Sequence, residues 1–220
     1  MKKERYEIKY QLNEIELIFI KSFLIRSSAS KFFNDRIVNS IYFDTPLFDF
    51  CNENLQGLSK RKKVRLRWYD EYTIPTLEFK LRNDRVGTKK NYSLPNITKK
   101  DLYQMEINSL TKKIFHNIQF DSSIGYLIPL VYINYEREYY ELENGIRITI
   151  DKKIKYRPLS FGSCLNSHKK ICDNKIIVEI KFSRNQKSAA KDLIKSLEIS
   201  PVRNSKYLNG LARLGYANYL

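Results

Sequence analysis

Val178-Glu179-Ile180-Lys181-Phe182 alternates charged and apolar residues, and Tyr6-Glu7-Ile8-Lys9-Tyr10 and Leu77-Glu78-Phe79-Lys80-Leu81 repeat the pattern. A period of two places Glu and Lys on one face of a β-strand and the large apolar residues on the other. In an ordinary sheet the charged face would lie in water as solvated ion pairs. In a closed antiparallel barrel covered by helices, it would line an interior that holds a ligand.

Three further predicted strands carry arginine in the same alternation: Val64–Tyr69, Asn134–Tyr139 and Gly145–Asp151. Arg65 and Arg67 would lie about 6–7 Å apart along one strand face, and two such charges call for an anion. The charged face predicted for all these strands carries Lys9, Arg65, Arg67, Lys80, Arg137, Arg147 and Lys181. A wall of this kind suits a polyanion, and the alternative is the solvated surface of a basic protein.

Composition sets the limits within which these strands fold. The chain has 220 residues, with 40 Lys and Arg against 24 Asp and Glu, for a formal net charge of +16. No Pro/Gly/Ser-rich linker divides it, so residues 1–220 are predicted to form a single domain. A net positive charge of this size attracts phosphates, nucleic acid or an anionic membrane surface.

The cysteines and the N-terminal sequence indicate in which cellular compartment the protein is expected. The three cysteines are odd in number and lack metal-like spacing, which is typical of a reduced, cytosolic protein. The N-terminus leads directly into a strand without an apolar signal region, and no segment approaches membrane-spanning length. We therefore expect a cytoplasmic protein, with peripheral attachment to a membrane as an open alternative.

Local signals predict the secondary structure. Asn13 and Glu16 form a capping-box pattern ahead of an apolar stretch that favours a helix packed outside the sheet. Residues 82–91 are basic and are expected to be a flexible connection that closes over an anion or a simple surface loop. Helices are expected at 15–25, within 98–120, at 186–198 and from Ser205, and a short helix or turn is expected at 47–54. Strands are expected at 40–45, 64–69, 76–81 and 176–182, and through 130–150 with a turn at 143–145.

Motifs of other enzyme classes do not occur in the sequence. The chain lacks a Gly-x-x-x-x-Gly-Lys phosphate loop, a Gly-x-Ser-x-Gly motif and a His/Cys metal cluster. His116 and His168 fall outside every alternating strand, so surface or packing roles are favoured over catalysis. Nucleotide-cleft and common hydrolase classes therefore lose support.

The strand motifs, in their order along the chain, resemble the VTC domain, the polyphosphate polymerase branch of the CYTH-like triphosphate tunnel metalloenzymes. The resemblance covers nearly the whole chain and implies an α+β fold, an antiparallel β-barrel tunnel with helices packed outside. The motifs are Glu7-Ile8-Lys9-Tyr10, Ser40-Ile41-Tyr42-Phe43-Asp44-Thr45, Lys63-Val64-Arg65-Leu66-Arg67-Trp68-Tyr69, Glu78-Phe79-Lys80, Tyr135-Glu136-Arg137, Arg147-Ile148-Thr149-Ile150-Asp151, Glu179-Ile180-Lys181 and Ser205-Lys206-Tyr207.

The resemblance also implies roles for individual residues. Glu179 matches the carboxylate that binds a divalent metal, and Mn²⁺ or Mg²⁺ suits one carboxylate with phosphate oxygens and water. Glu7 and Glu78 are either secondary metal ligands or partners that fix lysines, and the second role is preferred. The phosphate-binding set comprises Lys9, Arg65, Arg67, Lys80, Lys90 with Lys89 as its rival, Tyr135, Arg137, Arg147, Lys181, Ser205 and Lys206. Catalytic roles are predicted for Arg65, Arg67, Lys80, Arg137 and Lys181.

One departure separates the chain from hydrolytic tunnel enzymes. These begin with a Glu-x-Glu-x-Lys strand, whereas this chain has Arg5-Tyr6-Glu7-Ile8-Lys9. A cation in place of a carboxylate disfavours a second metal ion and therefore favours polymerisation over hydrolysis. The predicted reaction transfers the γ-phosphate of ATP to inorganic polyphosphate without a general base.

Two other functions stay open at this level. The same tunnel could hydrolyse triphosphate or nucleoside triphosphates, or the chain could be a non-catalytic module for polyphosphate, inositol phosphates or nucleic acid. Nucleic acid is disfavoured because the aromatics of several strands lie opposite the cations. A separate membrane partner would be needed to translocate a product.

Overall fold

The computed structural model describes residues 5–83, 86–116, 118, 124–167, 169–197 and 199–217. The strands are β1 Arg5–Leu12, β2 Ser30–Asp44, β3 Arg61–Tyr69, β4 Thr76–Asn83, β5 Val86–Ser93, β6 Ile128–Glu141, β7 Arg147–Pro158, β8 Ile171–Asp173 and β9 Ile176–Ser183. The helices are α1 Glu14–Arg26, α2 Asp49–Leu55, α3 Lys99–Gln104, α4 Ile107–Phe115, α5 Lys187–Ser196 and α6 Lys206–Arg213, with a 3₁₀ turn at Arg184–Gln186.

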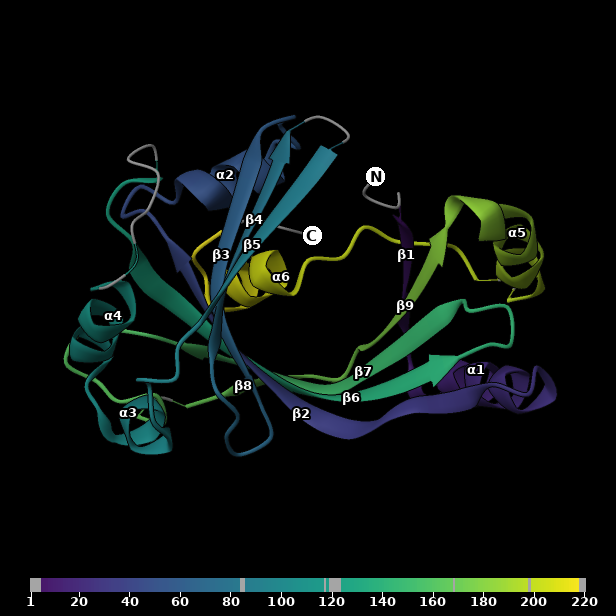
Figure 1. Cartoon of the computed structure of the whole chain (residues 1–220), viewed down its shortest axis with the longest axis horizontal. Helices are drawn as coiled ribbons and strands as arrows, with labels where there is room; N and C mark the ends of the chain where they lie inside the picture. Colours follow the sequence, from purple (N-terminus) through teal and green to yellow (C-terminus); the bar gives the residue numbers. More distant parts are fainter. Residues whose placement is uncertain are drawn as a thin grey trace. The chain divides into compact units, whose positions relative to one another are not determined.

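Among the described residues the strands are hydrogen-bonded in the order β1-β9-β7-β6-β2-β3-β4-β5, and β8 pairs with β7 (Figure 1). The chain divides into two compact units. The first contains Met1–Ile37, Tyr135–Ile154 and Asp173–Asn204, and the second contains Val38–Asn134, Lys155–Cys172 and Ser205–Leu220. Strands β2, β6, β7 and β8 contribute residues to both units.

In the first unit, β9 pairs antiparallel with β1 on one side and β7 on the other. One face of these strands is apolar and packs against helices α1 and α5. Leu17, Ile20 and Leu24 of α1 are buried in this cluster, as the spacing of the helix requires. The expectation that this first helix packs on the sheet is confirmed.

In the second unit, β3 pairs antiparallel with β2 and β4, and β4 pairs with β5. Alternate residues of β3, Val64, Leu66 and Trp68, are almost fully buried in a core that also contains side chains from α2, α3 and α4. In both units helices therefore cover the apolar face of the strands, and the charged residues are on the other face. This arrangement agrees with the helix-covered sheet of the second interpretation, while a ligand held by the charged face stays a prediction.

Capping residues set the helix ends where the sequence predicts them. The Asn13 side chain accepts from the Glu16 backbone N–H, and the Glu16 side chain accepts from the Asn13 N–H, both at 2.8 Å. Ser205 caps α6 by accepting from the Leu208 N–H. The turn between β6 and β7 uses Gly145 at φ +78°, a conformation that glycine adopts without strain.

The structure corrects two predicted segments. Residues 86–93 are not a flexible connection, because they form β5 and pair along β4, while Asp84 and Arg85 lie outside the described residues. Strand β2 begins at Ser30, well before the predicted start at Ser40. Exposed residues dominate its first half, so the apolar signal that marks its second half is missing there.

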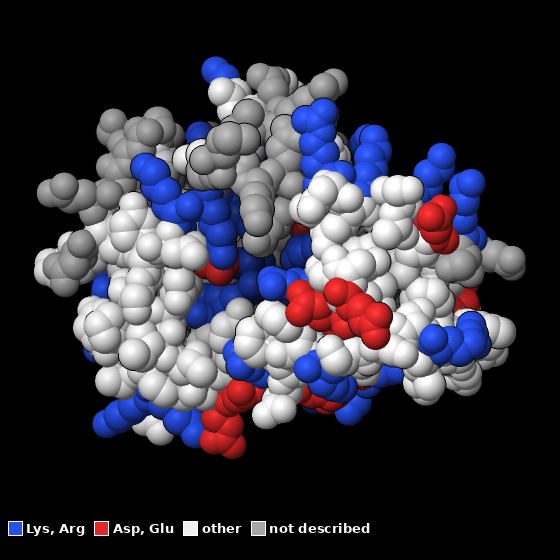
Figure 2. All heavy atoms as spheres, turned by 45° about the vertical axis from the view of Figure 1, so that its right-hand side comes forward, with Lys and Arg blue, Asp and Glu red and all other residues white. Residues whose placement is uncertain are grey.

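Lysine and arginine side chains are spread over the face shown in Figure 2, and acidic side chains gather in a few smaller groups. None of the helices formed by the described residues is both long and apolar enough to cross a membrane.

Candidate phosphate-binding site

Glu179 is the central carboxylate of the first unit. The strand register places it opposite Lys9 of β1 and Thr149 of β7. Its side chain is 8% exposed, the Lys181 ammonium contacts Oε1, and the Lys9 Nζ lies 3.8 Å from Oε2. Burial alone would raise the pKa of Glu179, but Lys181, Lys9 and Arg137 outweigh it and hold the pKa well below its usual range. The group is therefore ionised at neutral pH.

Glu7 shares the two lysines that hold Glu179. The Lys9 Nζ lies 2.9 Å from Glu7 Oε1, and the Lys181 Nζ lies 3.8 Å from Glu7 Oε2. The Lys9 Nζ also donates to the Asn204 carbonyl at 3.1 Å, which helps to fix its position. This geometry supports the interpretation that Glu7 positions lysines.

Arg137 is bound by a partner that sequence reasoning missed. Its Nε and Nη2 donate to the two carboxylate oxygens of Asp151 at 2.5 and 2.8 Å, and Asp151 is fully buried. The guanidinium also lies over the rings of Tyr135, at 5.3 Å, and Tyr139, at 5.9 Å. Asp151 lies two residues after Thr149 on β7, so the alternation of the strand places it on the same face as Glu179. This alternation is the sequence signal that could have identified Asp151 as a partner of Arg137.

Arg147 also lies on this strand, opposite Lys181. Its Nε donates to Glu141 at 3.0 Å, and its guanidinium lies 4.3 Å from the centre of the Phe32 ring. The structure therefore brings Lys9, Arg137, Lys181 and Glu179 together and directs the Arg147 head group to other partners.

The second unit has a comparable charged face around Glu78. The register sets Arg65 of β3 opposite both Glu78 and Tyr42. Arg65 donates to Glu78 Oε2 through Nε at 2.6 Å, and its Nη2 lies 2.5 Å from the same oxygen. Lys89 donates to Oε1 at 2.7 Å, and Arg67 Nη1 lies 4.0 Å from Oε2. Burial alone would raise the pKa of Glu78, but Arg65, Arg67 and Lys89 lower it to about 2.

The strand pairing also decides between Lys89 and Lys90. Lys89 lies opposite Lys80 and shares a face with Glu78, whereas Lys90 lies opposite the core residue Phe79. Lys63 lies on the other side of Lys80, so Lys63, Lys80 and Lys89 form a row of cations across three strands. Like charges that face one another directly are unfavourable without an anion.

The N-terminus of α6 adjoins this row, because the Lys63 Nζ donates to the Ser205 hydroxyl at 2.9 Å. Lys206 is the first residue of the helix and is half-buried. Backbone N–H groups at such an end favour anions. Ser205 therefore contacts the second unit's charged face through Lys63, and Lys206 follows it at the start of α6.

Tyr42 is a second residue that sequence reasoning did not select. Its hydroxyl accepts from Arg65 Nη1 at 2.9 Å, and its ring stacks on Tyr207 with centroids 5.2 Å apart. Burial alone would raise the pKa of the Tyr42 phenol, but Arg65, Arg67 and Lys63 lower it to about 7. A tyrosine poised to ionise near neutrality reports a strongly cationic surrounding.

Residues 4–215 match the family model of the VTC domain. The chain is a member of the VTC domain family. No curated protein matches it by sequence.

Solved structures show the fold of this VTC domain. A putative adenylyl cyclase from Hippeastrum, described as having a dominant triphosphatase activity, is 15% identical, with 98% of each chain covered and a TM-score of 0.57. A putative adenylate cyclase from Bacillus halodurans is also 15% identical, with 97% of this chain and 98% of that chain covered and a TM-score of 0.57. The PH1819 protein from Pyrococcus horikoshii is 14% identical with a TM-score of 0.52, covering 94% of this chain and 99% of that one. The VTC domain thus has the predicted α+β, CYTH-like triphosphate tunnel fold.

One donor near Glu179 bears on whether a metal suits this VTC domain. The Thr149 hydroxyl is buried and has no hydrogen-bond partner in the described part of the chain. It belongs to the strand position directly opposite Glu179. An ionised carboxylate beside an unsatisfied hydroxyl suits a hydrated hard cation or a phosphate oxygen. Within the described residues, however, no three His, Cys, Asp or Glu side chains are grouped to hold a metal by themselves.

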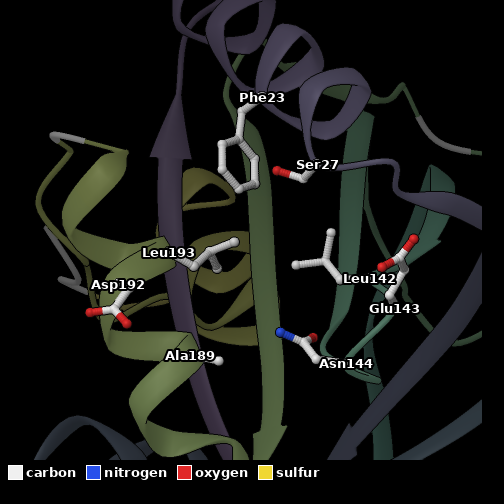
Figure 3. A pocket seen from close by; sticks show the side chains of 8 residues that line it. All are labelled: Phe23, Ser27, Leu142, Glu143, Asn144, Ala189, Asp192 and Leu193. Atoms are coloured by element: carbon white, nitrogen blue, oxygen red, sulfur yellow. The ribbon is translucent and has the colours of Figure 1, made fainter.

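A hollow of about 380 Å³ in the first unit lies away from the predicted residues. Figure 3 shows it between α1, α5 and the turn after β6. Its lining is Phe23, Ser27, Leu142, Glu143, Asn144, Ala189, Asp192 and Leu193. Two carboxylates and no lysine or arginine make this lining unsuited to phosphate.

Proposed function

We propose that this VTC domain is a metal-dependent polyphosphate polymerase that transfers the γ-phosphate of ATP to inorganic polyphosphate. The observation that carries the proposal is Glu179, a buried and ionised carboxylate surrounded by Lys9, Lys181 and Arg137. A phosphate polyanion is the ligand whose charge such a set of cations complements. Membership in the VTC family supports this choice of reaction.

The reaction exchanges one phosphoanhydride bond for another. A terminal oxygen of the polyphosphate chain forms a bond to the γ-phosphorus of ATP, the bond from that phosphorus to the β,γ-bridging oxygen breaks, and ADP leaves with that oxygen. The attacking oxygen is already anionic, so no general base is required. His116, the histidine among the described residues, is exposed at the end of α4, which is consistent with such a mechanism.

The protein groups have separate tasks in this proposal. Lys9 and Lys181 bind phosphate oxygens and release Glu179 and Glu7 as they do so. Arg137, oriented by Asp151, offers a fixed guanidinium to the transferred group. Glu179 would hold Mn²⁺ or Mg²⁺ together with phosphate oxygens, and this ion would neutralise charge that develops on them.

The second unit supplies the other predicted catalytic groups, Arg65, Arg67 and Lys80, and part of the binding set. Arg65, Arg67 and Lys80 bind further phosphates on the face that carries Glu78, with Lys89 favoured over Lys90 by the register. Glu78 keeps Arg65 in place and is not proposed to bind metal. In the first unit, the Tyr135 ring helps to position Arg137, whose guanidinium lies 5.3 Å from its centre.

Incubation with ATP and Mn²⁺ tests the proposal, with products separated by chain length and with ADP and free phosphate measured. Polyphosphate and ADP in matching amounts are expected. Free phosphate without chains would identify a triphosphate hydrolase instead. Tight polyphosphate binding with no turnover would identify a binding module.

Arg5 provides a variant that separates polymerase from hydrolase. Its backbone pairs with Ser183 of β9, and its position corresponds to a carboxylate of the hydrolytic pattern. Arg5→Glu is expected to increase free phosphate relative to polyphosphate. Lys2→Glu, with the same change of charge three residues earlier, is the matched control.

A further inference from the structure

A second group of cations lies on the face of β6 that is opposite Arg137. Alternation along the strand turns Glu138 and Tyr140 away from the side of Arg137. The Glu138 side chain is only 6% exposed, although it is ionised. Burial alone would raise its pKa, but Lys152, Lys21 and the Tyr140 hydroxyl lower it to about 2.

Three lysines from three separate elements converge on this one carboxylate. Lys152 of β7 places its Nζ 2.5 Å from Glu138 Oε1, and Lys21 of α1 donates to Oε2. Lys31, near the start of β2, places its Nζ 3.9 Å from the same Oε2. Three ammonium groups that share one carboxylate repel one another.

Tyr140 holds two of these ammonium groups side by side. The Lys21 and Lys31 Nζ atoms lie 5.0 and 4.9 Å from the centre of its ring, within the range of cation–π attraction. The Tyr140 hydroxyl accepts from Lys21 at 2.7 Å and donates to Glu138 at 2.6 Å. Burial and Glu138 raise the pKa of this phenol to about 12, so it stays a donor.

The carboxylate of Glu138 is buried, whereas the three lysines around it are partly exposed to solvent. The side chains of Lys21, Lys31 and Lys152 are 34, 47 and 28% exposed. Asp35 is a further acid at this cluster and pairs with Lys31, but at 55% exposure it forms a surface pair that an anion can displace. The surface offered to a ligand is therefore cationic.

We propose that Lys21, Lys31 and Lys152 form a second phosphate-binding site, which takes a compact polyanion with several phosphate groups. Oligophosphates, inositol phosphates and phospholipid head groups share the required chemistry. The inference goes beyond the proposed polymerase activity and does not depend on it, because none of its residues belongs to the Glu179 or Glu78 groups.

Acetylation footprinting of the full chain tests the site directly. The acetylation rate of each lysine is followed by mass spectrometry with tripolyphosphate, with inositol hexakisphosphate, and with phosphatidylcholine vesicles with or without phosphatidylinositol bisphosphate. At least one phosphate-bearing probe is expected to slow labelling of Lys21, Lys31 and Lys152 several-fold. Protection by the soluble probes would identify a free phosphate compound as the ligand, and protection by the acidic vesicles would identify a phospholipid head group.

Variants separate this site from the tunnel face. Lys31→Gln/Lys152→Gln is expected to weaken binding of the protecting probe about tenfold and to remove the protection of Lys21, while ADP formation is retained. Lys153→Gln is the matched control, because Lys153 is the neighbouring lysine and already has its own partner, Glu136, at 2.9 Å. Glu138→Gln is expected to tighten binding, since it removes the buried negative charge.

The proposal is overturned if no probe slows labelling of the three lysines. It is also overturned if the double variant and Lys153→Gln have the same effect on binding. Protection that persists in a Glu179→Gln protein without turnover supports this site independently of the polymerase proposal.

Discussion

Glu179 and Glu78 lie in the same Glu-x-Lys strand pattern, but the two units give them different partners. Glu78 is held by the Arg65 guanidinium, with Nε and Nη2 at 2.6 and 2.5 Å. Glu179 is held by Lys9 and Lys181, which also contact Glu7. Arginine offers a rigid planar fork, whereas lysine is a flexible point charge. The same motif therefore gives Glu78 a rigid guanidinium beside Lys89, and gives Glu179 lysine partners that we propose it exchanges when phosphate binds.

The largest expected effect comes from removing the exchangeable carboxylate. Glu179→Gln should lower metal-dependent turnover by about 10³-fold, the scale of losing a central electrostatic group. Polyphosphate binding should change much less, because the surrounding cations are kept. ADP release and polyphosphate affinity are measured on the same preparation. Equal losses of both would contradict the metal-binding role and the contrast with Glu78.

The matching substitution in the second unit should act on stability. Glu78→Gln removes the buried carboxylate that holds the largely covered Arg65, and breaking buried pairs costs about 3–5 kcal/mol. Urea unfolding measures the free energy of unfolding. Glu71→Gln is the control, because Glu71 is 85% exposed. A Glu78 variant as stable as this control would remove the proposed supporting role.

The low pKa of Glu78 also predicts an acid-sensitive contribution to stability. Its pKa is about 2 in the folded chain against 4.5 for the free side chain, so the unfolded chain binds a proton first as pH falls. The contribution of Glu78 is fully present above about pH 4.5 and is lost as pH falls toward 2. Unfolding across this window should show a smaller pH dependence for Glu78→Gln than for the unchanged protein.

Tyr42 reports the cationic character of the second unit. Its pKa of about 7 predicts a rise in phenolate absorbance centred near neutral pH that is missing in Tyr42→Phe. Tripolyphosphate should raise this pKa, because it neutralises the arginines that stabilise the phenolate. Ultraviolet titration with and without the ligand measures the shift. An unchanged midpoint at saturating ligand would argue against phosphate binding on the Glu78 face.

The smallest expected effect concerns the hydroxyl opposite Glu179. Thr149→Val removes an oxygen that makes no hydrogen bond among the described residues and nearly keeps the side-chain volume. Stability should change little, while Mn²⁺-dependent turnover should fall up to about tenfold if the hydroxyl binds the hydrated ion or a phosphate. Thr88→Val, on exposed β5, is the control. Unchanged turnover would leave Thr149 without a role in binding.

Sequence reasoning succeeds where a strand has strict alternation. The motifs around Lys9, Arg65, Glu78 and Glu179 lie in strands, and their apolar faces are covered by helices. It fails at β5, where Val86–Ser93 contains few apolar residues and is stabilised by pairing with β4. An edge strand of this kind has little local signal, because its hydrogen bonds depend on a neighbour.

The partners of individual charges show the same limit. The sequence indicates that Arg137 faces a ligand, but it does not show that Asp151 binds both guanidinium nitrogens. Nor does it decide between Lys89 and Lys90, which a shift of one residue would exchange between faces. Ion-pair geometry depends on register between strands that are distant in the chain.

The sequence by itself determined the strands that alternate strictly, which face of these strands is charged, and the family to which the chain belongs, because these follow from a local period of two and an ordered set of motifs. Only the tertiary structure decided which cations meet which carboxylates. It gave Glu179 its lysines, Glu78 its arginine, and Glu138 the three lysines of the second phosphate site. The physical reason is that charge pairs form within a few ångströms in space, and strand pairing sets those distances.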